Sequence, residues 1–177
     1  VSSAASDVYK RQAKHLIELN IPYSQDEAEI GQRIAQIEEK NDIILDDIQK
    51  QAVHKAVLNG LMVITGGPGT GKTTTINTII KYFEMEGLEI RLAAPTGRAA
   101  KRMAETSGYE AQTIHRLLEI CGSASDSQNT GMHFERNEDN PLETDVIIVD
   151  EMSMVDVSIM NSLLTVSYTH LTLPTIL

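Results

Sequence analysis

The chain has 177 residues with a formal net charge of −10, and it is 41% hydrophobic and 23% charged. This is the length of one domain with ordinary globular composition, and such an acidic chain does not coat nucleic acid through its average charge. The single cysteine excludes an internal disulfide, no apolar run has transmembrane length, and residues 1–12 lack the apolar stretch of a signal peptide. We therefore expect a cytoplasmic protein without a membrane contact.

The two ends of the chain are related at the DNA level. Residues 2–12 read SSAASDVYKRQ, and residues 166–175 read VSYTHLTLPT. One DNA string encodes the first peptide, and its reverse complement in another frame encodes the second. The string resembles the transposase adapter of sequencing libraries; the alternative is a natural tail at each end. We expect adapter-derived tails at 1–12 and 166–177, which are left out of the fold prediction.

Two helices are expected upstream of a glycine-rich segment. Ser24 opens a Ser-Gln-Asp-Glu capping pattern, and isoleucines follow at helical spacing, which predicts a helix over about 25–40 with Ile30, Ile34 and Ile37 on its apolar face. Asp46 or Asp47 can cap a second helix, which Gly60 ends. Its expected buried side consists of Ile48, Ala52, Val53, Ala56 and Val57. We therefore expect a helical segment over 13–44 before a domain over 45–165.

Short apolar runs and helices alternate in the rest of the chain. The runs at 61–65, 90–94 and 145–149 predict buried parallel strands. Helices are expected over 72–86, 97–105, 113–119 and 156–164. Residues 121–141 are rich in Ser, Asn, Asp and Gly, which predicts a surface loop or hairpin. This alternation indicates an α/β fold with a parallel sheet.

Residues 66–73 read GGPGTGKT and fit the pattern G-x-x-x-x-G-K-[ST] between a strand and a helix. The glycines allow backbone N–H groups to turn toward a phosphate, and the helix start adds its positive dipole end. Lys72 can reach the β and γ phosphates, and Thr73 can offer a hydroxyl to Mg²⁺. The alternative is a glycine-rich turn that merely matches. The expected nucleotide-binding residues are Gly67, Gly69, Thr70, Gly71, Lys72, Thr73 and Thr74.

Two acidic residues, Asp150 and Glu151, follow the apolar run at 145–149. Ligands of parallel α/β sheets lie at such strand ends. We expect Asp150 to hold Mg²⁺ through its water shell and Glu151 to orient and deprotonate the attacking water. Acids at a strand end are common, and it is the phosphate cradle upstream that favours the functional interpretation.

Four segments occur in the order GGPGTGKTTT, LAAPTGRAAKRM, AQTIHRLL and VDEMSMVD. Together they resemble a RecD-like DNA helicase of superfamily 1. The resemblance implies a partial RecA-like P-loop ATPase domain, the N-terminal part of the motor core, with Lys72 and Glu151 as catalytic residues. It also implies ATP and Mg²⁺ as cofactors, 5′→3′ travel, and single-stranded DNA and duplex junctions as partners, while protein partners stay open.

The resemblance also implies roles for residues outside the cradle. Gln49 matches a glutamine that reads the adenine ring. Two loops match segments that contact DNA, one with Pro95, Thr96, Gly97 and Arg98 and the other with Thr113 and His115. Independently, positive charge gathers here, which suits contact with a phosphate backbone; the basic side chains are Arg98, Lys101, Arg102, His115 and Arg116. For Lys101 and Arg102 a solvated helix face is the alternative.

The family's fold has a strand between the cradle strand and the Asp-Glu strand that would begin beyond residue 165. We expect this strand and the second motor domain with its arginine finger to be missing, so that the chain binds nucleotide weakly, unwinds nothing and is marginally stable.

Other interpretations stay open for the parent protein. It could be the RecD subunit of an exonuclease V-type helicase–nuclease complex, or the helicase part of a conjugative relaxase. A P-loop GTPase switch is a different class, although the sequence has no N-K-x-D guanine-reading motif. The chain itself could also lack any activity.

Overall fold

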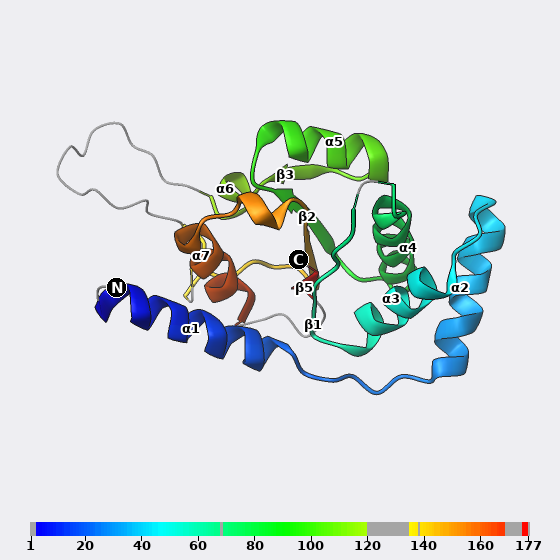
Figure 1. The fold of residues 1–177 in the computed structure, drawn as a ribbon, viewed down its shortest axis with the longest axis horizontal. Coiled ribbons are helices and arrows are strands. Elements are labelled where there is room, and N and C mark those ends of the chain that lie inside the picture. Colours follow the sequence, from blue (N-terminus) through cyan, green and yellow to red (C-terminus); the bar gives the residue numbers. More distant parts are fainter. Residues whose placement is uncertain (1–2, 68, 120–134, 138, 169–174, 177) are drawn as a thin grey trace.

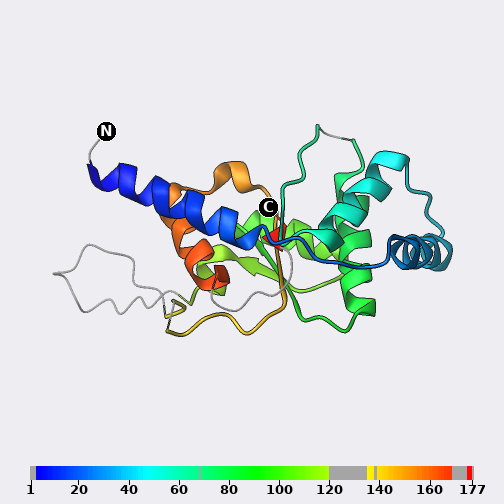
Figure 2. The ribbon, with the colours of Figure 1, turned by 90° about the horizontal axis from the view of Figure 1, so that it is seen from below.

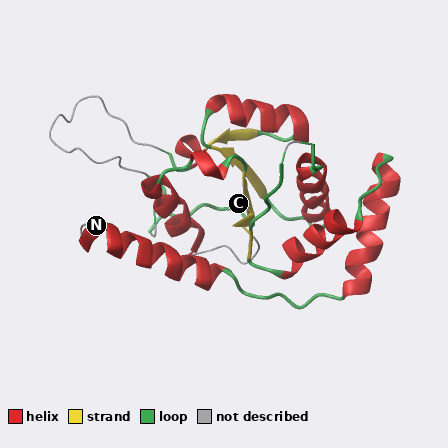
Figure 3. Cartoon of the chain, in the orientation of Figure 1, coloured by secondary structure: helices red, strands yellow, loops and turns green. Residues whose placement is uncertain are grey.

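A parallel sheet lies at the centre of the computed structural model, which describes residues 3–67, 69–119, 135–137, 139–168 and 175–176. The strand order is β1-β5-β4-β2-β3, which confirms the predicted α/β fold (Figures 1 and 3). The strands are β1 (Leu61–Met62), β2 (Ile90–Ala94), β3 (Ala111–Thr113), β4 (Val146–Val149) and β5 (Thr175–Ile176). The helices are α1 (Ser3–Leu19), α2 (Glu27–Asn41), α3 (Asp47–Leu58), α4 (Lys72–Met85), α5 (Gly97–Ser107), α6 (Ile114–Leu117), the 3-10 turn η1 (Met152–Met154) and α7 (Val157–Tyr168). Most of the loop predicted at 121–141 lies outside the described residues.

Helices cover both faces of the sheet because its central strands are apolar on both sides. Along β4, Val146 and Ile148 belong to a core shared with α2, α3 and α4, while Ile147 and Val149 belong to a second core shared with α6 and α7. Successive side chains of a strand point to opposite faces, and all four residues of β4 are buried. In Figure 1, α2, α3 and α4 accordingly lie on one side of the sheet and α6 and α7 on the other.

The helices α2 and α3 form largely as predicted, with two corrections. The predicted faces are buried at Ile30, Ile34 and Ile37, and Asp46 caps α3 through a capping box with Gln49. However, Asp26 and not Ser24 caps α2, where its carboxylate accepts from the amide of Ala28 at 2.9 Å. Ile48 is 78% exposed, so its predicted place on the buried side of α3 is wrong. It follows Asp47 in the first turn of α3.

The strand predicted at 61–65 is shorter and more exposed than expected. Only Leu61 and Met62 form β1, neither is buried, and Val63 is 61% exposed. The reason lies in its neighbour, because β5 offers β1 only two residues for pairing. The three-residue strand β3 was not predicted at all; it pairs with β2 in the register Leu92 to Ala111.

The expectation of an empty place between the cradle strand and the Asp-Glu strand is also wrong. Residues Thr175–Ile176 occupy it and pair in parallel with both β1 and β4. Each side of β5 is joined by two residue pairs, whereas β2 and β4 share four. The centre of the sheet is therefore closed, but by a strand of only two residues.

Two terminal helices form an outer layer. The unpredicted helix α1 packs along α7, and the side-chain amide of Gln12 donates to the carbonyl of Val157 at 2.6 Å. Figures 1 and 2 show α1 beside α7, with α2 at the opposite end of the molecule. α1 crosses the predicted boundary at 12/13, and α7 continues to Tyr168 beyond the predicted end at 164. None of the helices described by the structure has the length and apolar character needed to span a bilayer.

Candidate nucleotide site

Two glycines allow the predicted cradle to turn. Gly69 and Gly71 both have φ of 77°, in the left-handed region that favours glycine. Gly71 is the N-cap of α4, and a Cβ atom there would lie 2.2 Å from the side-chain nitrogen of Gln49. The loop therefore needs glycine at position 71 both for its backbone angle and for the close approach of α3.

The polar side chains of the cradle bond to the loop itself. Lys72 donates from Nζ to the carbonyl of Gly66, and Thr70 donates from Oγ1 to the carbonyl of Gly67 at 2.9 Å. Thr73 is exposed at the first turn of α4, whereas Thr74 is half-buried. The first-turn amides of α4 and its positive dipole end face the same loop. An ammonium, a hydroxyl and a helix start are thus collected beside one turn.

The acidic pair lies where β4 ends. The amide of Asp150 donates to the carbonyl of Ala93 in β2 at 3.0 Å, which fixes the strand end. The Asp150 carboxylate then accepts from the amide of Glu151 at 2.8 Å. Glu151 has φ of 58° and ψ of 38°, a left-handed conformation that is uncommon for a residue with a side chain. Such strain occurs where function constrains the backbone.

One cavity of about 700 Å³ joins the cradle to the acidic pair. Its wall includes all the described residues of the cradle from 66 to 73 together with Asp150 and Glu151. Glycine amides, an ammonium and two carboxylates therefore border the same space, as the sequence predicted. Thr74 is not on this wall, and its hydroxyl lies one position further along α4.

The donor set suits Mg²⁺ bound together with phosphate. Thr73, which carries a hydroxyl, and Asp150, which carries a carboxylate, line the same cavity, and Mg²⁺ prefers oxygen ligands, usually one or two from the protein and the rest from water and phosphate. The described residues contain no cluster of three or more His, Cys, Asp or Glu that could hold a metal alone. A cation here would depend on water and the nucleotide for most of its ligands.

Gln49 lies beside the cradle. Its side-chain oxygen accepts from the amide of Asp46 at 2.9 Å, and its side-chain nitrogen lies 3.4 Å from the carbonyl of Gly71. It is not on the wall of the 700 Å³ cavity. One side chain thus caps α3 and touches the turn that starts α4.

The two predicted DNA-contacting loops lie at the same edge of the sheet as the cavity. They follow β2 and β3, which are parallel neighbours with Ala94 opposite Thr113. Thr96 caps α5 by accepting from the amide of Ala99 at 3.2 Å, and Thr113 caps α6 by accepting from Arg116 at 3.1 Å. Pro95 and His115 are half-buried, while Gly97 and Arg98 are exposed. The structure therefore brings both loops together.

Sequence reasoning missed one wall of the cavity. The second half of α5 contributes Arg102, Met103 and Thr106 to it. The sequence placed Arg102 only in a basic patch, because its position on the cavity wall depends on how α5 packs against β2 and β3. The helical spacing from Arg98 was the only local signal.

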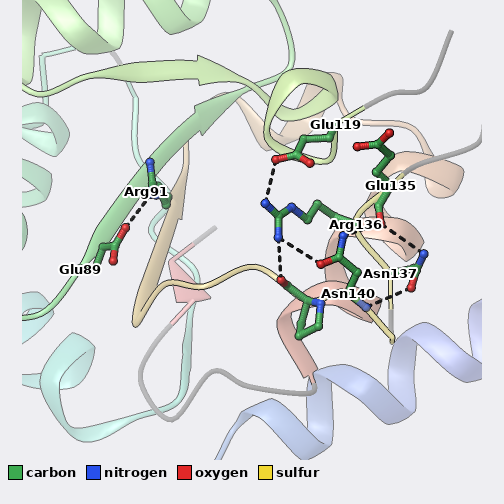
Figure 4. A network of polar contacts seen from close by, with 8 residues as sticks. Glu89, Arg91, Glu119, Glu135, Arg136, Asn137 and Asn140 are labelled. Atoms are coloured by element: carbon green, nitrogen blue, oxygen red, sulfur yellow. Dashed lines mark hydrogen bonds and ion pairs between the residues drawn. The ribbon is translucent and has the colours of Figure 1, made fainter.

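A second polar cluster lies toward the opposite ends of the strands. Figure 4 shows Arg136 between Glu119 at 2.9 Å and Asn140 at 3.4 Å, with a further bond to the carbonyl of Pro141 at 3.1 Å. This arginine connects the end of α6 to the segment that enters β4. These partners indicate that Arg136 has a structural role, holding the two chain segments together.

The comparisons with known proteins agree with this geometry. A family model described as "AAA domain" matches residues 49–173. The ATP-dependent RecD2 DNA helicase of Deinococcus radiodurans is 41% identical over 120 residues, which cover 68% of this chain and 16% of that protein. The RecBCD enzyme subunit RecD of Mycolicibacterium smegmatis is 38% identical over 139 residues, which cover 66% of this chain and 24% of that protein. The RecBCD enzyme subunit RecD of Haemophilus influenzae is 36% identical over 144 residues, which cover 67% of this chain and 21% of that protein. The chain thus spans less than a quarter of the length of these relatives.

Proposed function

The chain belongs to the AAA domain family, and on that premise we propose that it is the ATP-binding front part of a 5′→3′ DNA helicase motor. The observation that carries the proposal is the cavity shared by Lys72 of the cradle and Asp150 of the acidic pair. Nucleoside triphosphate hydrolysis needs phosphate-binding amides and a cation-binding carboxylate around one ligand. The similarity to RecD and RecD2 helicases supports the choice of ATP and DNA.

The main polar residues of the site have proposed tasks. Lys72 binds the β and γ phosphates, Thr73 and Asp150 hold Mg²⁺, and Glu151 orients and deprotonates the attacking water. The backbone amides of the cradle bind the remaining phosphate oxygens. Mg²⁺ neutralises charge that develops on the phosphates during transfer. Gln49 reads the adenine ring from its place beside Gly71.

Single-stranded DNA is the proposed second ligand. Thr96 and Arg98 after β2 and Thr113 at the end of β3 supply hydroxyls and positive charge at one edge of the sheet, as backbone contact requires. The exposed start of α5 also presents its positive dipole end there. Because DNA is the proposed ligand, we place the parent protein in the cytoplasm of its cell.

A free-standing helicase is the first choice for the parent protein, because the RecD2 relative shares 41% identity. A subunit of a helicase–nuclease complex is the second candidate, and the relatives named RecBCD enzyme subunit RecD favour it with 36% and 38% identity. Co-purification of the parent with two large partner subunits would support the second candidate.

The test is nucleotide binding to the 177-residue chain in the presence of Mg²⁺, measured with a fluorescent ATP analogue. Lys72→Ala should weaken binding by roughly tenfold or more, since hydrogen bonds to charged groups are worth about 1.5–3 kcal/mol. Lys55→Ala, which removes an exposed lysine of α3, is the matched control and should bind as the wild type does. Equal affinities of Lys72→Ala and wild type would refute the proposal, and a preference for GTP would favour a GTPase switch.

A further inference from the structure

An arginine outside the predicted site forms an ion pair with the proposed water-activating residue. Nη1 of Arg102 lies 4.0 Å from Oε1 of Glu151. Both side chains border the 700 Å³ cavity. Among the described residues, Arg102 is the one basic side chain in ion-pair contact with Glu151. The carboxylate that should act on water is therefore engaged by a helix that belongs to the DNA-facing side.

The helix α5 connects this ion pair to the proposed DNA loop. It begins at Gly97, directly after the Thr96 cap, and Arg98 lies in its first turn. Residues four apart lie on the same face of a helix, so Arg98 and Arg102 share one face. Arg98 is exposed and makes no ion pair within the described part of the chain. A DNA phosphate at Arg98 would lie within one helical turn of Arg102.

The ion pair is weak enough to be exchanged. The side chains of Arg102 and Glu151 are 76% and 43% exposed. An exposed pair at this separation is stabilised little because water screens it. A phosphate carries a full negative charge with several acceptor oxygens and suits the forked guanidinium better than a distant carboxylate does. Arg102 can therefore leave Glu151 at small cost when DNA arrives.

Glu151 is held at its backbone by hydrogen bonds, whereas its side chain is engaged by the ion pair with Arg102. Its left-handed backbone is fixed by the Asp150 carboxylate and by the bond from the amide of Met154 to its own carbonyl at 3.0 Å. Within the described residues, Arg102 is the ion-pair partner of its carboxylate. Losing that partner would free the carboxylate without moving the strand end.

We propose that Arg102 is a switch residue shared between Glu151 and the DNA backbone. Without DNA it pairs with Glu151 and restrains that carboxylate; with single-stranded DNA on α5 it turns to a phosphate and releases Glu151 to activate water. Arg102 is thus a positioning residue that makes hydrolysis depend on DNA. This inference rests on the proposed function and adds to it the means of coupling.

The test is a double-mutant cycle on DNA binding, which needs no hydrolysis. A fluorescein-labelled oligo(dT) is titrated with the wild-type chain, Arg102→Gln, Glu151→Gln and the double variant, and its anisotropy is followed at several salt concentrations. Glu151→Gln frees Arg102, so it should tighten binding by about two- to fivefold, the range that corresponds to an exposed ion pair. In the Arg102→Gln background the same change should have no such effect.

Salt dependence identifies a direct phosphate contact. Arg102→Gln should reduce the slope of log affinity against log salt by about 0.7, the value for one phosphate contact on a single strand. Arg102→Lys keeps the charge and should restore most of that slope. A residue that only supports the fold would lower affinity without changing the slope in this way. Thermal melting of each variant checks that it folds.

A control separates the ion pair from general charge. Glu110→Gln removes an exposed acidic side chain just after α5 and should change affinity equally in the wild-type and Arg102→Gln backgrounds. Equal effects of Glu151→Gln in the two backgrounds would overturn the switch while leaving the proposed function intact. Failure of all the proteins to bind oligo(dT) would refute the switch and the proposed DNA contact together, while nucleotide binding through Lys72 would be judged by its own measurement.

Discussion

At the scale of the residue, Gly71 and Gly31 differ in how much space a side chain would have. Gly71 has φ of 77°, and a Cβ atom added to it would lie 2.2 Å from the side-chain nitrogen of Gln49. Gly31 lies inside α2, with nothing within 4 Å of an added Cβ atom. The same change to alanine therefore has opposite consequences at these positions.

We expect Gly71→Ala to destabilise the chain by more than about 1–2 kcal/mol, the cost of a left-handed backbone for a residue with Cβ, because the contact with Gln49 adds to it. Gly31→Ala should stabilise the chain by about 0.5–1 kcal/mol, since alanine suits a helix interior better. Urea unfolding of both variants measures the difference. Equal stability of Gly71→Ala and wild type would contradict the cradle geometry.

At the scale of the element, Glu38 ties the end of α2 to the start of α3. Its carboxylate accepts from the amide of Leu45 at 2.8 Å and lies 3.1 Å from the ammonium of Lys50. The hydrogen bond from the Leu45 amide and, after it, Lys50 lower the pKa of Glu38, although burial opposes them. Only 17% of the side chain is exposed, so this polar contact adds to the apolar packing between α2 and α3.

This lowered pKa gives the fold a pH dependence. The ionised carboxylate stabilises the folded state above the ordinary glutamate pKa, and the contribution is lost as the pH falls through the lowered pKa. Glu38→Gln should therefore cost about 1 kcal/mol at pH 7 and little at pH 3. Glu39→Gln, an exposed neighbour on α2, is the control. A constant difference between wild type and Glu38→Gln from pH 7 to 3 would disprove the assignment.

The elements that could be predicted are those with a local signal. β2 was predicted to the residue, and α4 to within one residue, because an apolar run and a glycine-bounded helix leave little choice. β3 was missed because Ala111, Gln112 and Thr113 carry no apolar pattern, and their pairing comes from β2. Ile48 was assigned to the core because its helical spacing fits, yet the buried residues of α3 are Val53, Ala56 and Val57 and its first turn leaves Ile48 exposed.

At the scale of the whole molecule, the candidate site was predictable where residues are adjacent in sequence and not where packing brings them together. The cradle and the acidic pair are continuous motifs, so their meeting in one cavity follows from parallel strands ending at one edge. The contribution of Arg102 depends on the path of α5 over that edge. The occupation of the sheet centre by Thr175–Ile176 depends on the fold of the entire chain.

A chain ending at Tyr168 tests that central pairing. Removing residues 169–177 deletes β5 and leaves the facing edges of β1 and β4 without a partner. Exposed strand edges invite pairing between molecules, so the shortened chain should melt less cooperatively and form aggregates in light scattering. Removing residues 1–6 alone, at the start of α1, is the control. An unchanged, sharp melt of the shortened chain would mean that β5 contributes nothing.

Sheets usually lose protection of their amide hydrogens from the outer strands inward, but this one joins its two halves through a strand of two residues. On one side of β5 lies β1, which leads into the cradle, and on the other side lies β4, which leads into the acidic pair. A nucleotide that contacts both Lys72 and Asp150 would connect the segments that follow β1 and β4. We therefore expect hydrogen exchange in β1 to slow when ligand binds, by up to about 2.7 kcal/mol at a hundredfold excess over Kd. The bound nucleotide would thus add to the connection between β1 and β4 that β5 provides through only two residue pairs on each side.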